Sequence, residues 1–91
     1  MIVRYDPDFI TKLKKLDVRV HKSFKESLTI FIDHPHNPQL NNHPLKRNYL
    51  GYRSIDITND WRVIFSEKIE QGETIAFFVG IGNHKELYRI N

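Results

Sequence analysis

The residues best suited to acid–base chemistry lie near the C-terminal end of the 91-residue chain. Asn83 is followed three residues later by Glu86, a capping-box spacing that predicts a short helix opening at His84. The helix dipole at that end favours the neutral imidazole, which can accept a proton. Tyr88 lies four residues further along the same helix face. The competing interpretation is that this pair only packs and caps a helix end.

A second candidate, His43, precedes Pro44, which favours an extended backbone and predicts that this histidine lies in a loop. Together with His34 and His36 it raises the alternative of a metal site. The spacing matches no strong metal-binding pattern, so we expect no metal. The chain also lacks a glycine-rich phosphate loop and a nucleophile elbow, and we expect no cofactor.

Cations and aromatic rings alternate in the C-terminal half. Arg53 and Arg62 are interleaved with Tyr49, Tyr52 and Trp61, a combination that single-stranded RNA binding uses. The same interleaving is common in ordinary sheets, in which Trp61 would simply fill the core.

Two aspartates flank these residues. Asp56 is expected on the sheet face opposite Ile55 and Ile57, either as a site residue or as a solvated strand residue. Asp60 is expected to cap the turn before Trp61.

Positive charge is concentrated in one N-terminal window. Fourteen Lys and Arg oppose 11 Asp and Glu over the whole chain. Between residues 12 and 25, however, only Asp17 opposes the six cations that we call the basic stripe: Lys12, Lys14, Lys15, Arg19, Lys22 and Lys25. Such a stripe serves a polyanion or an acidic partner, although a solvated helix face is the competing interpretation.

The elements that must position these residues follow from hydrophobic periodicity. Phe9, Leu13 and Leu16 step by four and three, and Asp6 and Pro7 provide a helix start. In chain order the sequence predicts a strand at 2–5, helices at 7–16 and 18–33, a surface loop at 36–48, strands at 50–57, 61–69 and 73–81, and a helix opening at 84. This order predicts an α+β fold, with two antiparallel N-terminal helices packed on one face of an antiparallel sheet and a short C-terminal helix.

Length and composition limit the class of protein. Ninety-one residues predict one domain spanning 1–91, and 40% hydrophobic with 27% charged residues is ordinary globular usage. No run of 18 apolar residues and no signal peptide is present, so we expect a cytoplasmic protein without membrane contact. The absence of cysteine excludes disulfides, thiol catalysis and cysteine-ligated metals.

Four short segments, taken in order, resemble the RelE/ParE toxin superfamily and most closely its YafQ-like members. They are residues 42–45 (NHPL), 51–53 (GYR), 60–65 (DWRVIF) and 81–88 (IGNHKELY). The helix start at Asp6 and the basic helical segment also fit, so the resemblance covers essentially the whole chain. It implies a RelE-like fold.

The resemblance also implies a function. It implies the toxin of a prokaryotic type II toxin–antitoxin pair, which enters the ribosomal A site, contacts ribosomal RNA and cuts messenger RNA without metal. The 2′-hydroxyl attacks the adjacent phosphorus, so the chemistry needs acid–base groups and cations. His84 is implied as acid or base, His43 as its assistant, Asp60 as an orienting residue and Tyr88 as a nucleotide contact. An acidic, partly disordered antitoxin is implied as partner in a hetero-oligomer, and the basic stripe would bind this antitoxin or ribosomal RNA.

Two positions depart from the YafQ-like pattern. Asp56 stands where such proteins carry a His, and Gly80 stands where many carry an Arg. The charge on the phosphate must then be met by Lys46, Arg47, Arg53 or Lys85, or else cleavage is reduced. Asp56 and Trp61 are the other residues expected to bind substrate. Two alternatives remain, which are a ParE-like gyrase inhibitor and a non-catalytic member that only binds antitoxin.

Overall fold

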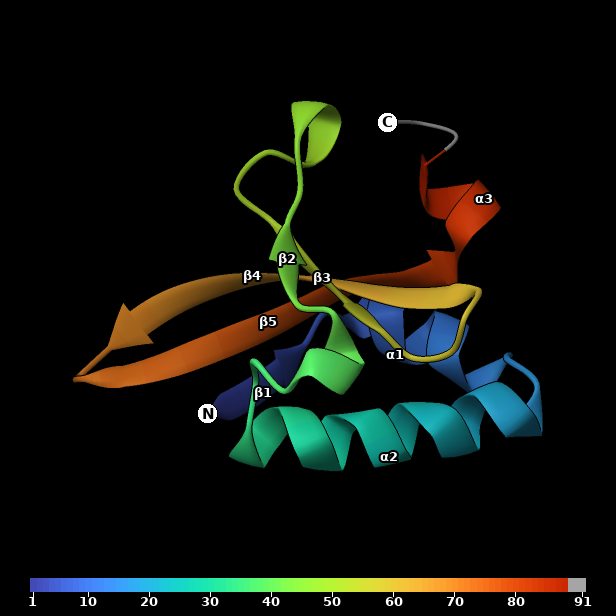
Figure 1. Cartoon of the computed structure of the whole chain (residues 1–91), viewed down its shortest axis with the longest axis horizontal. Coiled ribbons are helices and arrows are strands. Elements are labelled where there is room, and N and C mark those ends of the chain that lie inside the picture. The colour runs from blue at the N-terminus through green and yellow to red at the C-terminus, as the bar shows by residue number, and fades with distance from the viewer. Residues whose placement is uncertain (89–91) are drawn as a thin grey trace.

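The structure, a computed structural model, describes residues 1–88 and has a mixed α+β fold (Figure 1). Its elements in chain order are β1 (Ile2–Tyr5), α1 (Pro7–Lys14), α2 (Val18–Asp33), the 3-10 helix η1 (Pro38–Leu40), β2 (His43–Pro44), the 3-10 helix η2 (Arg47–Tyr49), β3 (Arg53–Asp56), β4 (Trp61–Glu70), β5 (Glu73–Asn83) and α3 (His84–Tyr88). The predicted fold class is confirmed.

Two aspartates begin the N-terminal helices. The Asp6 carboxylate accepts a hydrogen bond from the backbone N–H of Asp8 at 2.8 Å, and Pro7 occupies the first turn. The Asp17 carboxylate accepts from the N–H of Arg19 at 2.7 Å. Each cap satisfies a backbone donor that the helix itself leaves unpaired. The sequence therefore determines the break between α1 and α2 as predicted.

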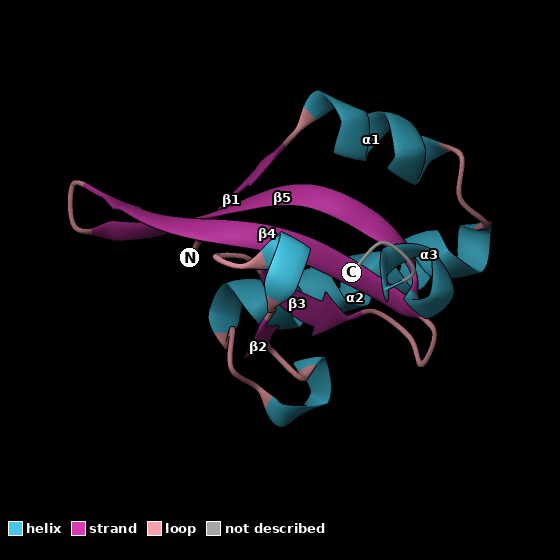
Figure 2. Ribbon diagram, turned by 90° about the horizontal axis from the view of Figure 1, so that it is seen from above, coloured by secondary structure: helices cyan, strands magenta, loops and turns pink. Residues whose placement is uncertain are grey.

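The five strands form one sheet in the order β1-β5-β4-β3-β2 (Figure 2). Strands β3, β4 and β5 pair antiparallel, as predicted, and β2 adds antiparallel to β3. Strand β1 instead joins the far edge parallel to β5. The sheet is thus mixed rather than wholly antiparallel. The long connection between β1 and β5, which contains α1 to β4, allows these two strands to run in the same direction.

The main core lies between the helices and one face of the sheet. Phe9 of α1 and Phe31 of α2 pack with Phe65 and Phe78 of the central strands, and all four side chains are fully buried. The rings of Phe31 and Phe65 meet edge-on with centroids 5.1 Å apart. In Figure 1, α2 lies below the sheet, whereas α3 rises above it. We call the two faces the helix-covered face and the open face.

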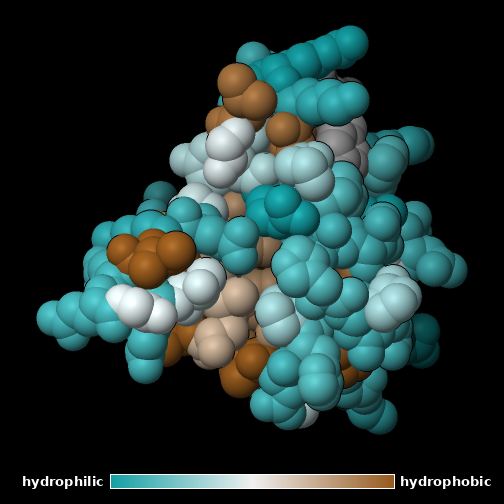
Figure 3. Space-filling model, turned by 60° about the vertical axis from the view of Figure 1, so that its left-hand side comes forward, coloured by the Kyte–Doolittle hydropathy of each residue, from teal (hydrophilic) through white to brown (hydrophobic). Residues whose placement is uncertain are grey.

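A second, smaller apolar cluster covers part of the open face. Leu45, Ile64 and Leu87 are its buried members, with Tyr49 and Tyr52 packed against them. The expectation that this face is partly free therefore holds with this addition. The remaining apolar surface forms small separate patches among hydrophilic residues (Figure 3), and the large exposed apolar residues are Ile2, Val18, Ile32, Leu50 and Ile69.

The segment at 36–48, predicted as a surface loop, is more ordered than its composition suggests. Leu40 is 1% exposed and Leu45 is 6% exposed, and both anchor the segment to the protein. Between them, His43 pairs with Ser54 in the short strand β2, so this histidine is a strand residue rather than a loop residue. Two anchors five residues apart follow no strand or helix period, which is why the pattern missed them.

Among the described helices, none is long and apolar enough to cross a membrane.

Strand β5 and helix α3 approach closely at Gly82. A Cβ atom at this position would lie 3.1 Å from Cγ and Cδ2 of Leu87. At Gly80, on the same strand, a Cβ would meet only the Cβ of Ile64, at 3.8 Å. A side chain at Gly82 would therefore press on Leu87 and disturb the packing of α3, whereas Gly80 has room for a Cβ.

We expect Gly82→Ala to lower the free energy of unfolding by about 1–3 kcal/mol, because the added methyl group overpacks Leu87. Gly80→Ala is the matched control and should change stability by no more than about 1 kcal/mol in either direction. Urea denaturation measures the free energy of unfolding of both variants, and an unchanged m-value shows that only stability has changed. Equal stabilities of the two variants would contradict the close approach at Gly82.

Candidate functional site

The register of the sheet decides which candidate side chains share a face, because directly opposed residues on paired strands point the same way. His43 is opposite Ser54, Ser54 is opposite Ile64, and Ile64 is opposite Gly80. Ile64 belongs to the apolar cluster of the open face. His43 and Gly80 therefore lie in one row across the open face.

A second row lies beside the first. Asp56 is opposite Arg62, and Arg62 is opposite Gly82. The row ends next to the start of α3, which begins at His84. From a strand spacing of about 4.8 Å and a rise of about 3.4 Å per residue, the Cα atoms of His43 and Arg62 lie about 12 Å apart.

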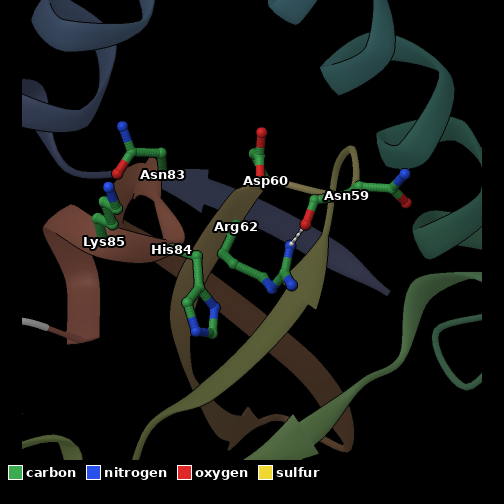
Figure 4. A pocket seen from close by; sticks show the side chains of 6 residues that line it. All are labelled: Asn59, Asp60, Arg62, Asn83, His84 and Lys85. Atoms are coloured by element: carbon green, nitrogen blue, oxygen red, sulfur yellow. Dashed lines mark hydrogen bonds between the residues drawn. The ribbon is translucent and has the colours of Figure 1, made fainter.

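A hollow of about 590 Å³ lies at the end of this second row, where the β3–β4 turn meets α3 (Figure 4). The residues that line it are Asn59, Asp60, Arg62, Asn83, His84 and Lys85. The sequence predicted three of these as site residues, namely Asp60, His84 and Lys85. Two cations and an imidazole in one hollow suit an anionic ligand.

Helix α3 is anchored at its first turn by three contacts from different elements. The backbone N–H of His84 donates to the carbonyl of Asp60 at 2.7 Å. The side chain of Asn83 accepts from the N–H of Glu86 at 2.8 Å, which confirms the predicted cap. Lys12 of α1 donates to the carboxylate of Glu86 at 3.1 Å. These contacts fix the place of His84 at the edge of the hollow.

Asp60 contributes through its backbone rather than its carboxylate. Figure 4 shows its side chain pointing away from the imidazole of His84. The predicted capping role in the turn belongs instead to Thr58, whose hydroxyl accepts from the N–H groups of Asp60 at 3.2 Å and Trp61 at 3.1 Å. The side chain of a threonine reaches these donors because it lies two to three residues before them.

Arg62 was grouped with Arg53 as an RNA-binding candidate in the sequence, but the resemblance gave it no role. Its Nη1 donates to the carbonyl oxygens of Thr58 at 3.0 Å, Asn59 at 3.1 Å and Trp61 at 3.3 Å. Figure 4 shows the guanidinium beside the ring of His84. The side chain is only 14% exposed, so the hollow has a fixed cation at its base.

Asp56 forms an ion pair with Arg62. Its Oδ1 lies 3.0 Å from Nε of Arg62, and both side chains are largely buried. The predicted face of Asp56 is correct, but its carboxylate neither lines the hollow nor lies in solvent as an unpaired group. It places a negative charge next to the guanidinium of Arg62.

Two residues predicted to bind substrate lie on the other face. Arg53 is opposite Phe65, a fully buried core residue, so it belongs to the helix-covered face. Trp61 packs against the main core, as the simpler interpretation held. Neither side chain lines the hollow, because strand alternation sends both away from it.

The other predicted cations differ in exposure and place. Lys85 lines the hollow. Lys46 and Arg47 are exposed in the segment around η2, which stands above the open face at the top of Figure 1. In the basic stripe Lys12 is paired with Glu86, and the other members, Lys14, Lys15, Arg19, Lys22 and Lys25, are exposed.

The tautomer of His43 follows from one contact. Its Nδ1 lies 2.7 Å from the carbonyl oxygen of Asn41. A carbonyl can only accept, so Nδ1 carries the proton and Nε2 of the neutral ring keeps its lone pair. His43 is therefore prepared to accept a proton at Nε2.

The alternative metal residues are not assembled with His43. His34 and His36 are exposed just after α2. Within residues 1–88, no three His, Cys, Asp or Glu side chains form a group that could hold a metal ion. Tyr88 ends α3, but its side chain lies outside the described part of the chain.

Comparison with a family model gives one match that spans residues 3–89. Its description is "Bacterial toxin of type II toxin-antitoxin system, YafQ". No curated protein sequence matches the chain.

Solved structures share the fold at low sequence identity. The YoeB/ParE toxin from Agrobacterium tumefaciens is 17% identical, covers 92% of this chain and 99% of its own, and superposes with a TM-score of 0.73. YafQ from E. coli strain BL21(DE3) is 24% identical, with 94% and 96% coverage and a TM-score of 0.70. The toxin in the E. coli DinJ–YafQ toxin–antitoxin complex is 24% identical, with 94% of each chain covered and a TM-score of 0.67.

Proposed function

The chain belongs to the YafQ family of bacterial type II toxins, and from that premise we propose that it is an endoribonuclease which cuts messenger RNA in the ribosomal A site. The observation that carries the proposal is the hollow in which the imidazole of His84 lies beside the fixed guanidinium of Arg62. An acid–base group next to a fixed cation is what phosphodiester cleavage requires.

The proposed reaction needs no group from outside the protein and its substrate. A base removes the proton of the 2′-hydroxyl, the oxygen forms a bond to the adjacent phosphorus, and the bond from phosphorus to the 5′-oxygen breaks. An acid gives a proton to the leaving 5′-oxygen. The products are a cyclic phosphate and a free 5′-hydroxyl end.

We assign the base to His43 and the acid to His84. The hydrogen bond from Nδ1 of His43 to the carbonyl of Asn41 leaves Nε2 able to accept the 2′-hydroxyl proton. His84 lines the hollow next to Arg62 and, in its protonated form, can give a proton to the leaving oxygen. Both residues belong to the open face, which an RNA strand can cross from one histidine to the other.

Arg62 and Lys85 are the cations that we assign to the phosphate. They replace Arg53, whose side chain lies on the helix-covered face, as the compensation for the cation missing at Gly80. Asp56 contributes by holding Nε of Arg62 rather than by touching the substrate. Lys46 and Arg47, above the open face, are proposed to contact the RNA backbone on either side of the cut.

An acidic, partly disordered antitoxin is the proposed partner in a cytoplasmic hetero-oligomer. The exposed cations of the basic stripe support it, since they present positive charge on α1 and α2. The same surface would contact ribosomal RNA when the antitoxin is absent. Lys12 joins the stripe to α3 through Glu86, so the stripe begins next to the proposed site.

Two alternative functions, gyrase inhibition and antitoxin binding without catalysis, would need different residues. A gyrase inhibitor needs no acid–base histidines, whereas this chain has two on one face. A member that only binds antitoxin is favoured by the lack of a cation at Gly80. Expression in cells separates the three, because the outcomes are arrest of translation, a DNA damage response, or no toxicity.

We expect His84→Ala to lower the rate of message cleavage on purified ribosomes by about 10²–10⁴-fold, the usual contribution of an acid–base group. Antitoxin binding should stay near that of the wild type, because the imidazole is not part of the basic stripe. His36→Ala, at an exposed histidine far from the hollow, is the control. Cleavage by His84→Ala at the wild-type rate would remove His84 from the mechanism.

The basic stripe is tested by reversing three exposed charges, Lys14→Glu, Lys15→Glu and Lys22→Glu. Ribosome affinity should fall, and it should depend less steeply on salt, because fewer phosphate contacts release fewer counterions. Lys68→Glu, exposed on β4 outside the stripe, is the control for a single charge reversal and is compared with Lys22→Glu alone. If affinities for ribosome and antitoxin both stay unchanged, the stripe is only a solvated surface.

Gly80→Arg should raise the cleavage rate about tenfold or more, because one well-placed donor contributes on this scale to a phosphate transition state. The substitution is sterically permitted, since a Cβ meets only Ile64 at 3.8 Å. Gly80→Gln supplies similar length without charge and should leave the rate near that of the wild type. Equal cleavage rates for Gly80→Arg and Gly80→Gln would mean that a side chain at position 80 does not contact the phosphate.

A further inference from the structure

Strand β2 is too short to hold His43 in place by backbone pairing alone. It consists of His43 and Pro44, which pair only with Ser54 and Arg53 of β3 at the edge of the sheet. Pro44 has no N–H to donate. One more backbone hydrogen bond follows, from the N–H of Leu45 to the carbonyl of Tyr52 at 2.9 Å, and side-chain contacts add to this short pairing.

Arg53 makes two of these side-chain contacts, both to the residue just before His43. Its Nε donates to Oδ1 of Asn42 at 2.8 Å, and its Nη2 approaches the backbone oxygen of Asn42 at 3.4 Å. The side-chain amide of Asn42 in turn donates to the carbonyl of Pro35 at 2.9 Å. Asn42 is thus clamped between β3 and the chain that leaves α2.

Arg53 also forms an ion pair within the protein. Oε1 of Glu67 lies 3.9 Å from its Nε, and the arginine side chain is 24% exposed. Both residues flank the core on the helix-covered face. Arg53 therefore lies on the face opposite to the proposed phosphate site.

The clamp reaches the imidazole of His43 through one peptide plane. The carbonyl of Asn41, which accepts from Nδ1 of His43, belongs to the planar peptide that joins Asn41 to Asn42. Asn41 has φ of +50°, in the left-handed region, which residues other than glycine adopt uncommonly. Contacts with its neighbours must therefore help to hold this backbone conformation. Holding Asn42 therefore orients the carbonyl that sets the histidine tautomer.

We infer that Arg53 is a positioning residue, which clamps Asn42 and thereby keeps the neutral ring of His43 protonated at Nδ1 and open at Nε2. The inference rests on the proposed function for its catalytic consequence. The clamp itself concerns only this chain, and it can be measured without any substrate.

Nitrogen NMR of ¹⁵N-histidine-labelled protein tests the clamp directly, with the His43 signals assigned from a His43→Gln sample. In the wild type the neutral ring should show the Nδ1–H form. Arg53→Ala should populate the Nε2–H form, while the His84 signals stay unchanged. Arg53→Lys should do the same, because an ammonium cannot reproduce the two-nitrogen fork on Asn42.

Glu67→Gln is the matched control, because it removes the ion pair of Arg53 but leaves the bonds to Asn42. It should keep the wild-type tautomer. Arg53→Lys also covers the case in which Arg53→Ala fails to fold. Retention of the Nδ1–H form in the folded Arg53 variants would overturn the inference, whatever their activity.

Cleavage on ribosomes gives the catalytic consequence. Arg53→Ala should lower kcat by about 10–100-fold with little change in KM, because small misplacements of a reacting group cost up to about 10² in rate. In a His43→Ala background it should have no further effect, and a further tenfold loss would overturn the positioning role. A His43→Ala protein that cleaves at the wild-type rate would instead refute the proposed base, while the tautomer measurement still decides the clamp.

Discussion

The hydrogen bond from the backbone N–H of His84 to the carbonyl of Asp60, at 2.7 Å, is the contact on which the hollow depends. It joins α3 to the β3–β4 turn, two segments more than twenty residues apart in sequence. The preceding carbonyls of the same turn, those of Thr58 and Asn59, hold Arg62. The backbone oxygens of one turn thus position both a histidine and an arginine. Backbone groups in a capped turn have little freedom, so this turn is a rigid support for the site.

The sequence was sufficient for the elements whose signals are local. The helix caps at Asp6 and Asn83, the break at Asp17 and the period of the long hairpin predicted the helices and central strands to within about three residues at their ends. The parallel pairing of β1 with β5 and the strand at His43 were not predicted, because both depend on partners far along the chain rather than on a local period. Hydrophobic spacing describes what an element buries, and it does not say which edge that element joins.

The pairing of β3 with β4 determines which of two arginines lies at the candidate site. Arg53 and Arg62 lie on adjacent strands and are equally interleaved with aromatic residues, so composition could not separate them. The register places Arg53 opposite Phe65 on the helix-covered face and Arg62 opposite Asp56 on the open face. This register was within reach of the sequence, because a hairpin centred on Asn59 brings Asp56 and Arg62, each three residues away, directly opposite one another.

The two departures from the YafQ-like pattern are connected through this register. Gly80 and Asp56 lie in neighbouring rows of the same face, and Arg62 stands in the row of Asp56. A histidine at position 56 would offer Arg62 no fixed negative charge, whereas the carboxylate of Asp56 meets its Nε at 3.0 Å. Under the proposed function, the cation absent at Gly80 is replaced by one held from the adjacent row. Asp56 is then the change that makes Gly80 tolerable, because a largely buried guanidinium without a carboxylate partner would be costly to keep at the base of the hollow.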